Sequence, residues 1–131
     1  FAQGSFRLAL EALYSRHTGG HELRYTLFGK PEPATYVYAE NLLETIAAAQ
    51  GAALHCVDSI KPRRRVYAVG DNPASDVAGA NAYGWTSLLV RTGVFDGSEG
   101  ENSREYPADA VVENVEEAVW WALEREESSR V

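Results

Sequence analysis

The segment at residues 65–95 constrains the fold most, because it joins two apolar runs through an acidic turn and a helix rich in small residues. The first run, residues 66–69, is short, partly β-branched and ends at Gly70. This pattern is typical of a parallel strand covered on both faces. Asp71 follows at the carboxyl end of that strand. Ligands of open α/β sheets bind at this edge, so Asp71 is a candidate site residue.

The turn after this strand places a second acidic residue near the first. Asn72 suits the N-cap of the next helix and Pro73 suits its first position. Asp76 then falls in the first helical turn, five residues beyond Asp71. Two carboxylates are therefore predicted to face one small volume, with helix capping as the alternative role for Asp71 and Asn72.

Further elements are predicted on both sides of this segment. Apolar spacing indicates helices over residues 1–20 and 34–50, and alternation at residues 23–28 indicates a strand between them. Gly79 and Ala80 are expected to let the central helix lie close to the sheet. A strand at residues 87–90, a polar loop at 96–107 and a short strand at 110–112 follow.

A last helix is predicted to close the chain. Asn114 and Glu117 have the spacing of a capping box. We expect the chain to fray from Glu124. The inward face of this helix is predicted to hold Val115, Ala118, Val119 and Ala122.

Three motifs, taken in this order, resemble those of a known superfamily. They are Gly29-Lys30-Pro31, Gly70-Asp71-Asn72-Pro73-Ala74-Ser75-Asp76 and Thr92-Gly93-Val94. The chain resembles the haloacid-dehalogenase (HAD) superfamily, in the class IIA branch with a large cap domain that includes the cat-eye-syndrome-critical-region-5-like proteins. The resemblance covers residues 1–122 and implies an α/β fold, a three-layer Rossmann-like core with a parallel sheet.

The resemblance also implies how the chain is organised. Residues 1–28 would be the end of the cap and its return to the core, residues 29–123 the C-terminal part of the core, and residues 124–131 a charged tail. The family's first motif, with the nucleophilic aspartate, and its second motif have no match here. We therefore expect a C-terminal part of a larger protein, inactive by itself and completed by an N-terminal part that carries the nucleophile and the cap.

The implied activity is phosphoryl transfer through an aspartyl-phosphate with Mg²⁺, acting on a phosphorylated small molecule. Lys30, fixed by its glycine and proline neighbours, would bind the phosphate and steady its charge. Asp71 would ligate Mg²⁺, and Asp76 would orient Lys30 or accept hydrogen bonds from metal-bound water. Asn72 would line the substrate site. The alternatives are a surface lysine at position 30 and, for the whole chain, a non-catalytic fold kept for structure or partner binding.

Composition excludes several other classes of partner. The formal net charge of −7 argues against a nucleic-acid or anionic membrane surface. No apolar run approaches the ~20 residues of a membrane span. Cys56, the single cysteine, cannot form an internal disulfide, which favours an intracellular location, and the resemblance suggests mitochondria.

Asp96-Gly97 is interpreted as a turn, because Val94 stands where a nucleophile motif would need an aspartate.

Overall fold

The computed structural model describes residues 3–50, 65–98 and 101–129. The predicted strands 66–69, 87–90 and 110–112 are all found within one residue of their expected bounds. Cys56 lies outside the described residues. In chain order the elements are α1 (Gln3–His17), α2 (Pro33–Ala49), β1 (Tyr67–Gly70), the single π-helical turn η1 (Pro73–Val77), α3 (Ala78–Tyr83), β2 (Thr86–Val90), β3 (Ala110–Val112) and α4 (Val115–Ser128).

The three strands form a parallel sheet in the order β1-β2-β3. Val69 pairs with Leu88 in the first ladder, and Leu89 pairs with Val111 in the second. The central strand is β2, where Leu88 and Leu89 are completely buried. In the described part of the chain β1 is an edge strand, and Val69 is 41% exposed. The expected cover on both faces of residues 66–69 is only partly found: η1 and α4 both contact β1, but Val69 stays exposed, and β2 is the more deeply buried strand.

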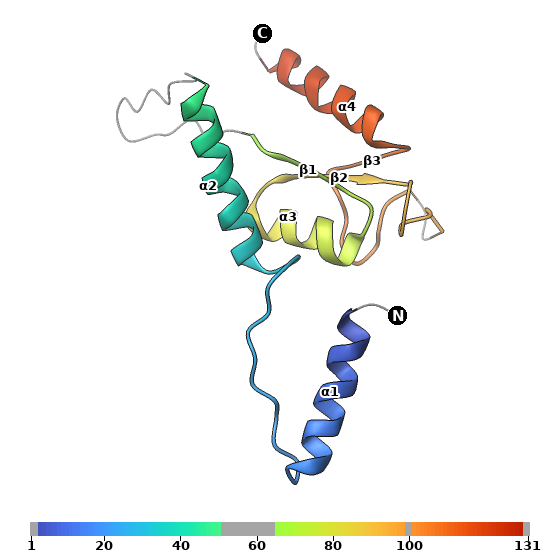
Figure 1. Cartoon of the computed structure of the whole chain (residues 1–131). Helices are drawn as coiled ribbons and strands as arrows, with labels where there is room; N and C mark the ends of the chain where they lie inside the picture. The colour runs from blue at the N-terminus through green and yellow to red at the C-terminus, as the bar shows by residue number, and fades with distance from the viewer. Residues whose placement is uncertain (1–2, 51–64, 99–100, 130–131) are drawn as a thin grey trace.

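Helices cover both faces of the sheet and give three layers (Figure 1). η1 and α3 lie on one face, with α2 packed beside α3, and α4 lies on the other. Leu89 belongs to the core under η1, and Leu88 to the core under α4. Adjacent strand residues point to opposite faces, so these two leucines serve one core each. The three-layer α/β architecture with a parallel sheet is confirmed.

α4 begins as predicted, with one change in its cap. Oδ1 of Asn114 accepts a hydrogen bond from the N–H of Glu117 at 3.1 Å, as a capping box requires. The Glu117 carboxylate accepts from the N–H of Glu113 at 3.0 Å, one residue earlier than in a standard box. The expected fraying from Glu124 is wrong. The helix continues to Ser128, and the Tyr67 hydroxyl donates to Glu126 at 2.6 Å, which ties the last turns to β1.

The inner face of α4 differs from the predicted one. Ala118 is completely buried and Ala122 packs beside it, as expected. Val115 and Val119 are exposed instead of buried. Trp121 takes the inner position, with its ring edge toward Tyr67 at a centroid distance of 6.3 Å. The helix is therefore rotated so that Trp121 faces the sheet, because its ring buries more apolar surface than either valine.

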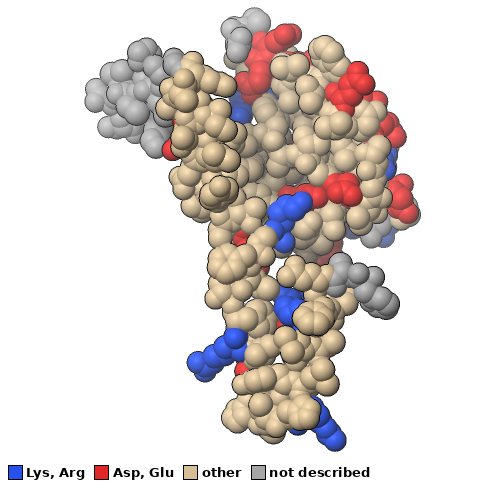
Figure 2. Space-filling view, viewed as in Figure 1, with Lys and Arg blue, Asp and Glu red and all other residues tan. Residues whose placement is uncertain are grey.

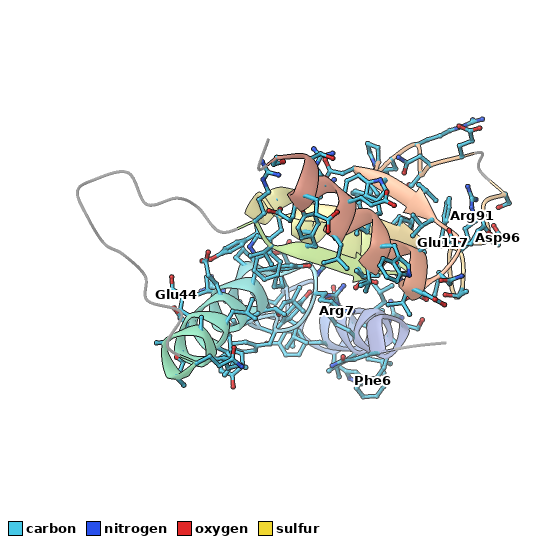
Figure 3. All side chains as sticks on the ribbon, turned by 90° about the horizontal axis from the view of Figure 1, so that it is seen from above. Phe6, Arg7, Glu44, Arg91, Asp96 and Glu117 are labelled. Atoms are coloured by element: carbon cyan, nitrogen blue, oxygen red, sulfur yellow. The ribbon has the colours of Figure 1, made fainter. Side chains whose placement is uncertain are left out.

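The segment before α2 is extended but belongs to no sheet. Residues 21–28 have no strand partner within the described part of the chain, so the strand predicted at 23–28 is wrong. Side chains hold this segment to α1 instead: the Tyr25 hydroxyl donates to Glu11, and the Arg7 guanidinium lies 5.6 Å from the centre of the Tyr25 ring. α1 lies apart from the three layers (Figure 1). Its Phe6 is 73% exposed and points away from the helix (Figure 3).

The surface of the three-layer part is acidic on the side shown in Figure 2. Aspartate and glutamate side chains gather over the sheet and α4, while the α1 region has few of them. Among the described residues, no helix has the length and apolar character that crossing a membrane demands.

Candidate active site

The turn after β1 is built by Asn72. Its Oδ1 accepts a hydrogen bond from the N–H of Ala74 at 3.1 Å, and its main-chain oxygen accepts from the N–H of Asp76 at 2.8 Å. Pro73 occupies the first position of η1, where the absent N–H costs nothing. The capping predicted for Asn72 is confirmed. Its amide is thereby held at the carboxyl end of β1, directly beside Asp71.

Asp71 is fixed by the loop that follows β2. Its Oδ2 accepts a hydrogen bond from the N–H of Val94 at 2.8 Å, and its main-chain oxygen accepts from the N–H of Phe95 at 2.9 Å. A Cβ atom at Gly93 would lie 2.0 Å from this Oδ2, so the loop fits Asp71 only without a side chain there. The carboxylate binds the loop and not the N-terminus of η1, which removes capping as its role.

Asp76 points back toward β1 from η1. Its Oδ2 accepts from the N–H of Asn72 at 3.1 Å, and its side chain is only 11% exposed. Gly70 makes this position accessible, because a Cβ atom there would lie 2.3 Å from Cβ of Asp76. The other carboxylate oxygen, Oδ1, faces a cation.

That cation is Lys30, whose Nζ lies 2.5 Å from Oδ1 of Asp76. Lys30 follows Gly29, which has a φ of 101°, a conformation favoured by glycine, and the turn closes through the N–H of Glu32 donating to Gly29 at 2.8 Å. The hydrogen bond with Asp76 raises the pKa of Lys30, and the charges of Asp76 and Asp71 raise it further. The ammonium therefore stays charged at neutral pH, and it is 55% exposed, so it can also meet an anion.

The structure thus brings the predicted site residues to one end of β1. Lys30 contacts Asp76, Asp76 contacts the main chain of Asn72, and Asp71 follows β1 directly. The arrangement offers one positive charge beside two carboxylates. Such a set can bind an anion together with a divalent cation that coordinates it, as in sites for phosphate esters.

Mg²⁺ can be tested against the donors that are present. Within residues 3–50, 65–98 and 101–129, no group of three or more histidine, cysteine, aspartate or glutamate side chains is placed to hold a metal. Mg²⁺ in phosphoryl-transfer sites usually takes one or two carboxylates, with water and phosphate oxygens completing the shell. Asp71 uses Oδ2 for the loop, which leaves Oδ1 as a possible ligand. The free Oδ1 of Asp71 fits one position in the coordination shell of such a Mg²⁺ ion.

One buried residue next to this site was not identified from the sequence. Tyr36 in α2 is 5% exposed, and its ring lies 5.7 Å from Tyr83 and 5.3 Å from Trp85. Gly79 was expected to let α3 approach the sheet, but a Cβ atom there would lie 2.0 Å from the Tyr36 hydroxyl. Gly79 therefore admits α2, not the sheet. In the sequence, Gly79, a glycine inside a short helix, indicated a close neighbour. The prediction named the sheet as that neighbour, whereas the structure shows α2.

The turn predicted at Asp96 is confirmed. Oδ1 of Asp96 accepts from the N–H of Ser98 at 2.8 Å, and Gly97 has a φ of 77°. Hydrogen bonds from Ser98 lower the pKa of the Asp96 carboxyl. Asp96 lies at the periphery of the molecule in the view of Figure 3. Asp96 is exposed and takes no part in the Lys30–Asp76 arrangement.

A hollow at the opposite end of the sheet is separate from this site. Asn81, Trp85, Thr86, Pro107 and Asp109 are among its lining residues, and Thr86 begins β2. Asn81 and Asp109 both accept hydrogen bonds from the buried Ser87. These polar groups hold the start of β2, so they serve the fold.

Comparison with known proteins gives the family. The HAD-hydrolase-like family model matches residues 27–118. The chain is 44% identical over 123 residues to a cardiolipin synthase (CMP-forming) / mitochondrial hydrolase fusion protein of Schizosaccharomyces pombe, covering 94% of this chain and 19% of that protein. It is 38% identical over 136 residues to a mitochondrial hydrolase of Saccharomyces cerevisiae, covering 95% of this chain and 38% of that protein.

A solved structure agrees with these relatives. The glycerol phosphate phosphatase of Mycobacterium tuberculosis, in complex with magnesium, is 26% identical with a TM-score of 0.50. The match covers 84% of this chain and 27% of that one. The chain thus spans well under half the length of these relatives. Its family model, its relatives and its fold agree, and the chain belongs to the HAD-hydrolase-like family.

Proposed function

We propose that this chain provides the lysine and acidic half of a Mg²⁺-dependent phosphatase site of the HAD type. The observation that carries the proposal is the ion pair between Lys30 and Asp76 beside Asp71, at the carboxyl end of β1. Phosphoryl transfer is catalysed mainly by positioning and by neutralising negative oxygens. An ammonium held by one carboxylate, beside a second carboxylate suited to Mg²⁺, supports that chemistry.

The residues divide this work among them. Lys30 binds the transferred phosphate and balances its charge, and Asp76 holds the ammonium in place. Asp71 supplies a metal ligand, and Mg²⁺ bound there would neutralise phosphate oxygens. Asn72 lines the substrate site next to Asp71. The substrate is a phosphorylated small molecule, in keeping with the phosphatase among the structural relatives.

The nucleophilic aspartate belongs, in this proposal, to an N-terminal part of the same protein that also carries the cap. Residues 29–123 would be the C-terminal part of the core, residues 1–28 the return from the cap and residues 124–131 a tail. Two relatives named as mitochondrial hydrolases support an intracellular, mitochondrial location. The acidic surface fits neither nucleic acid nor an anionic membrane as partner (Figure 2).

The test is turnover of phosphate monoesters by the full-length protein, with and without Mg²⁺. We expect activity that requires Mg²⁺ and that falls by about a hundredfold or more in Lys30→Met. Arg16→Met, which removes an exposed charge from α1, is the matched control and should retain activity. A full-length protein that hydrolyses none of a broad panel would favour the alternative, a HAD fold kept for structure or partner binding.

A further inference from the structure

Tyr36 lies between the two elements that carry the ion pair. It belongs to α2, which starts three residues after Lys30, and its side chain is almost completely buried. The ring stacks on Tyr83 with an interplanar angle of 27° and meets Trp85 edge-on at 74°. Three mutually packed aromatic rings leave the Tyr36 ring little freedom to move. The direction of its hydroxyl is therefore set by the packing of α2 against α3.

The hydroxyl is directed at the turn that holds Asp76. It donates a hydrogen bond at 3.3 Å to the main-chain oxygen of Ser75, the residue directly before Asp76. The backbone of Gly79 lies against the same hydroxyl and leaves no room for a side chain. Burial raises the pKa of Tyr36, and the nearby charge of Asp76 raises it further, so the hydroxyl remains a donor.

We propose that Tyr36 is a positioning residue, whose hydroxyl fixes η1 relative to α2 and so keeps the Asp76 carboxylate at the Lys30 ammonium. The inference rests on the proposed function, because it assigns Tyr36 to the same site. Lys30 and Asp76 are 46 residues apart in the chain, and their contact depends on how α2 packs against α3, which is continuous with η1. The hydroxyl of Tyr36 bonds the main chain of η1 from the α2 side. Catalysis that relies on a lysine in one place is sensitive to small shifts of its partner.

The first experiment compares steady-state kinetics of the full-length protein and its Tyr36→Phe variant. Phenylalanine keeps the ring packing and removes only the hydroxyl. We expect kcat to fall about three- to tenfold with KM within about twofold, because Lys30 still reaches the phosphate but is less well held. Tyr67→Phe is the matched control: it also removes a hydrogen-bonded hydroxyl, the one that binds Glu126 under α4. Its kcat should stay within about twofold of the unchanged protein.

The second experiment measures the ion pair without relying on turnover. Carbon-13 relaxation of the Lys30 Cε, assigned by its loss in Lys30→Met, reports how firmly the ammonium is held. We expect the Lys30 order parameter to drop in Tyr36→Phe and to stay unchanged in Tyr67→Phe. Gly79→Ala gives a second route, since its Cβ would displace the Tyr36 hydroxyl, and should lower the same order parameter.

The outcomes separate this inference from the proposed function. If Tyr36→Phe leaves both kcat and Lys30 order unchanged while Lys30→Met abolishes turnover, Tyr36 is only a packing residue and the inference is overturned. If no variant or parent protein turns over any phosphate ester, the phosphatase proposal fails. The relaxation data then still decide whether Tyr36 orders Lys30.

Discussion

Asp71 and Val94 join the ends of two neighbouring strands, because the Asp71 carboxylate accepts a hydrogen bond from the N–H of Val94 at 2.8 Å. Asp71 directly follows β1, and Val94 lies four residues beyond the end of β2. The position of Asp71 therefore depends on the loop after β2 as well as on its own strand. Changes in either segment should reach the site, and the first two predictions use this dependence.

The first prediction concerns Asp71→Asn in the full-length protein. The amide oxygen can still accept from Val94, so the loop should keep its place, but the negative charge that suits Mg²⁺ is lost. We expect Mg²⁺-dependent turnover to fall by about a hundredfold or more with little change in melting temperature. Asp96→Asn, at an exposed turn, is the control and should keep near-normal activity. Full activity in Asp71→Asn would remove Asp71 from the site.

The second prediction concerns Gly93→Ala. The new Cβ would lie 2.0 Å from Oδ2 of Asp71, so either the loop or the carboxylate must move. We expect a loss of about 1–3 kcal/mol in the free energy of unfolding, measured by denaturant titration. We also expect Mg²⁺ to stimulate turnover less than it does in the unchanged protein. The matched control is Gly4→Ala in α1, where a Cβ meets nothing within 4 Å. A Gly93→Ala variant with the same unfolding free energy as the unchanged protein would show that the loop yields without cost.

The third prediction concerns the pH dependence of the Lys30–Asp76 pair. The pKa of Lys30 is raised in the folded state by its bond to Asp76, so the protonated form stabilises the fold. That contribution is fully present below the unfolded pKa, about 10.4, and is lost as the pH rises through the higher folded pKa. Because Lys30 is 55% exposed, solvent screening keeps the contribution below about 1 kcal/mol.

A carbon-13 NMR titration of Lys30 would measure this shift directly. In Asp76→Asn the bond to a charged partner is absent, so the pKa should return toward its ordinary value. Comparing the two proteins at each pH cancels the titration of their shared tyrosines. An identical Lys30 pKa in both proteins would mean that the pair is not formed in solution.

The fourth prediction concerns Ser87, which is buried at the start of β2. Its hydroxyl donates to Oδ1 of Asn81 at 2.7 Å, and its N–H donates to Oδ2 of Asp109 at 2.8 Å. Ser87→Ala removes this donor from the exposed Asn81 side chain, so we expect a loss of about 0.5–1.5 kcal/mol in unfolding free energy. Ser128→Ala, which removes an exposed bond on α4, should change stability by less than about 0.5 kcal/mol. Comparable losses in both variants would contradict the role given to Ser87.

The strands and the acidic turn could be predicted because their signals are local. Residues 66–76 contain an apolar run, a glycine, a capping asparagine and a proline in the order that a strand, turn and helix require. The same local pattern placed Asp76 near Asp71. The ion pair with Lys30 was predicted only as one alternative, since it depends on contact across 46 residues.

The errors came from features that tertiary contacts decide. Residues 23–28 alternate like a strand, but alternation says only that the segment is extended and has two sides; a strand also needs a partner. In α4, valines and alanines at helical spacing define two overlapping faces, and contact between Trp121 and Tyr67 selects one. Tyr36 was not identified from the sequence, because its role depends on contacts with Ser75 and Gly79, which lie about forty residues away.

Three side chains of the site rest against glycine backbones: Asp76 on Gly70, Tyr36 on Gly79 and Asp71 on Gly93. Such contacts depend on excluded volume, which dissolved ions do not screen as they screen the exposed charge of Lys30. Raising the ionic strength should therefore weaken the attraction between Lys30 and an anionic ligand while the carboxylates keep their places. The site would lose affinity in concentrated salt long before it lost its shape.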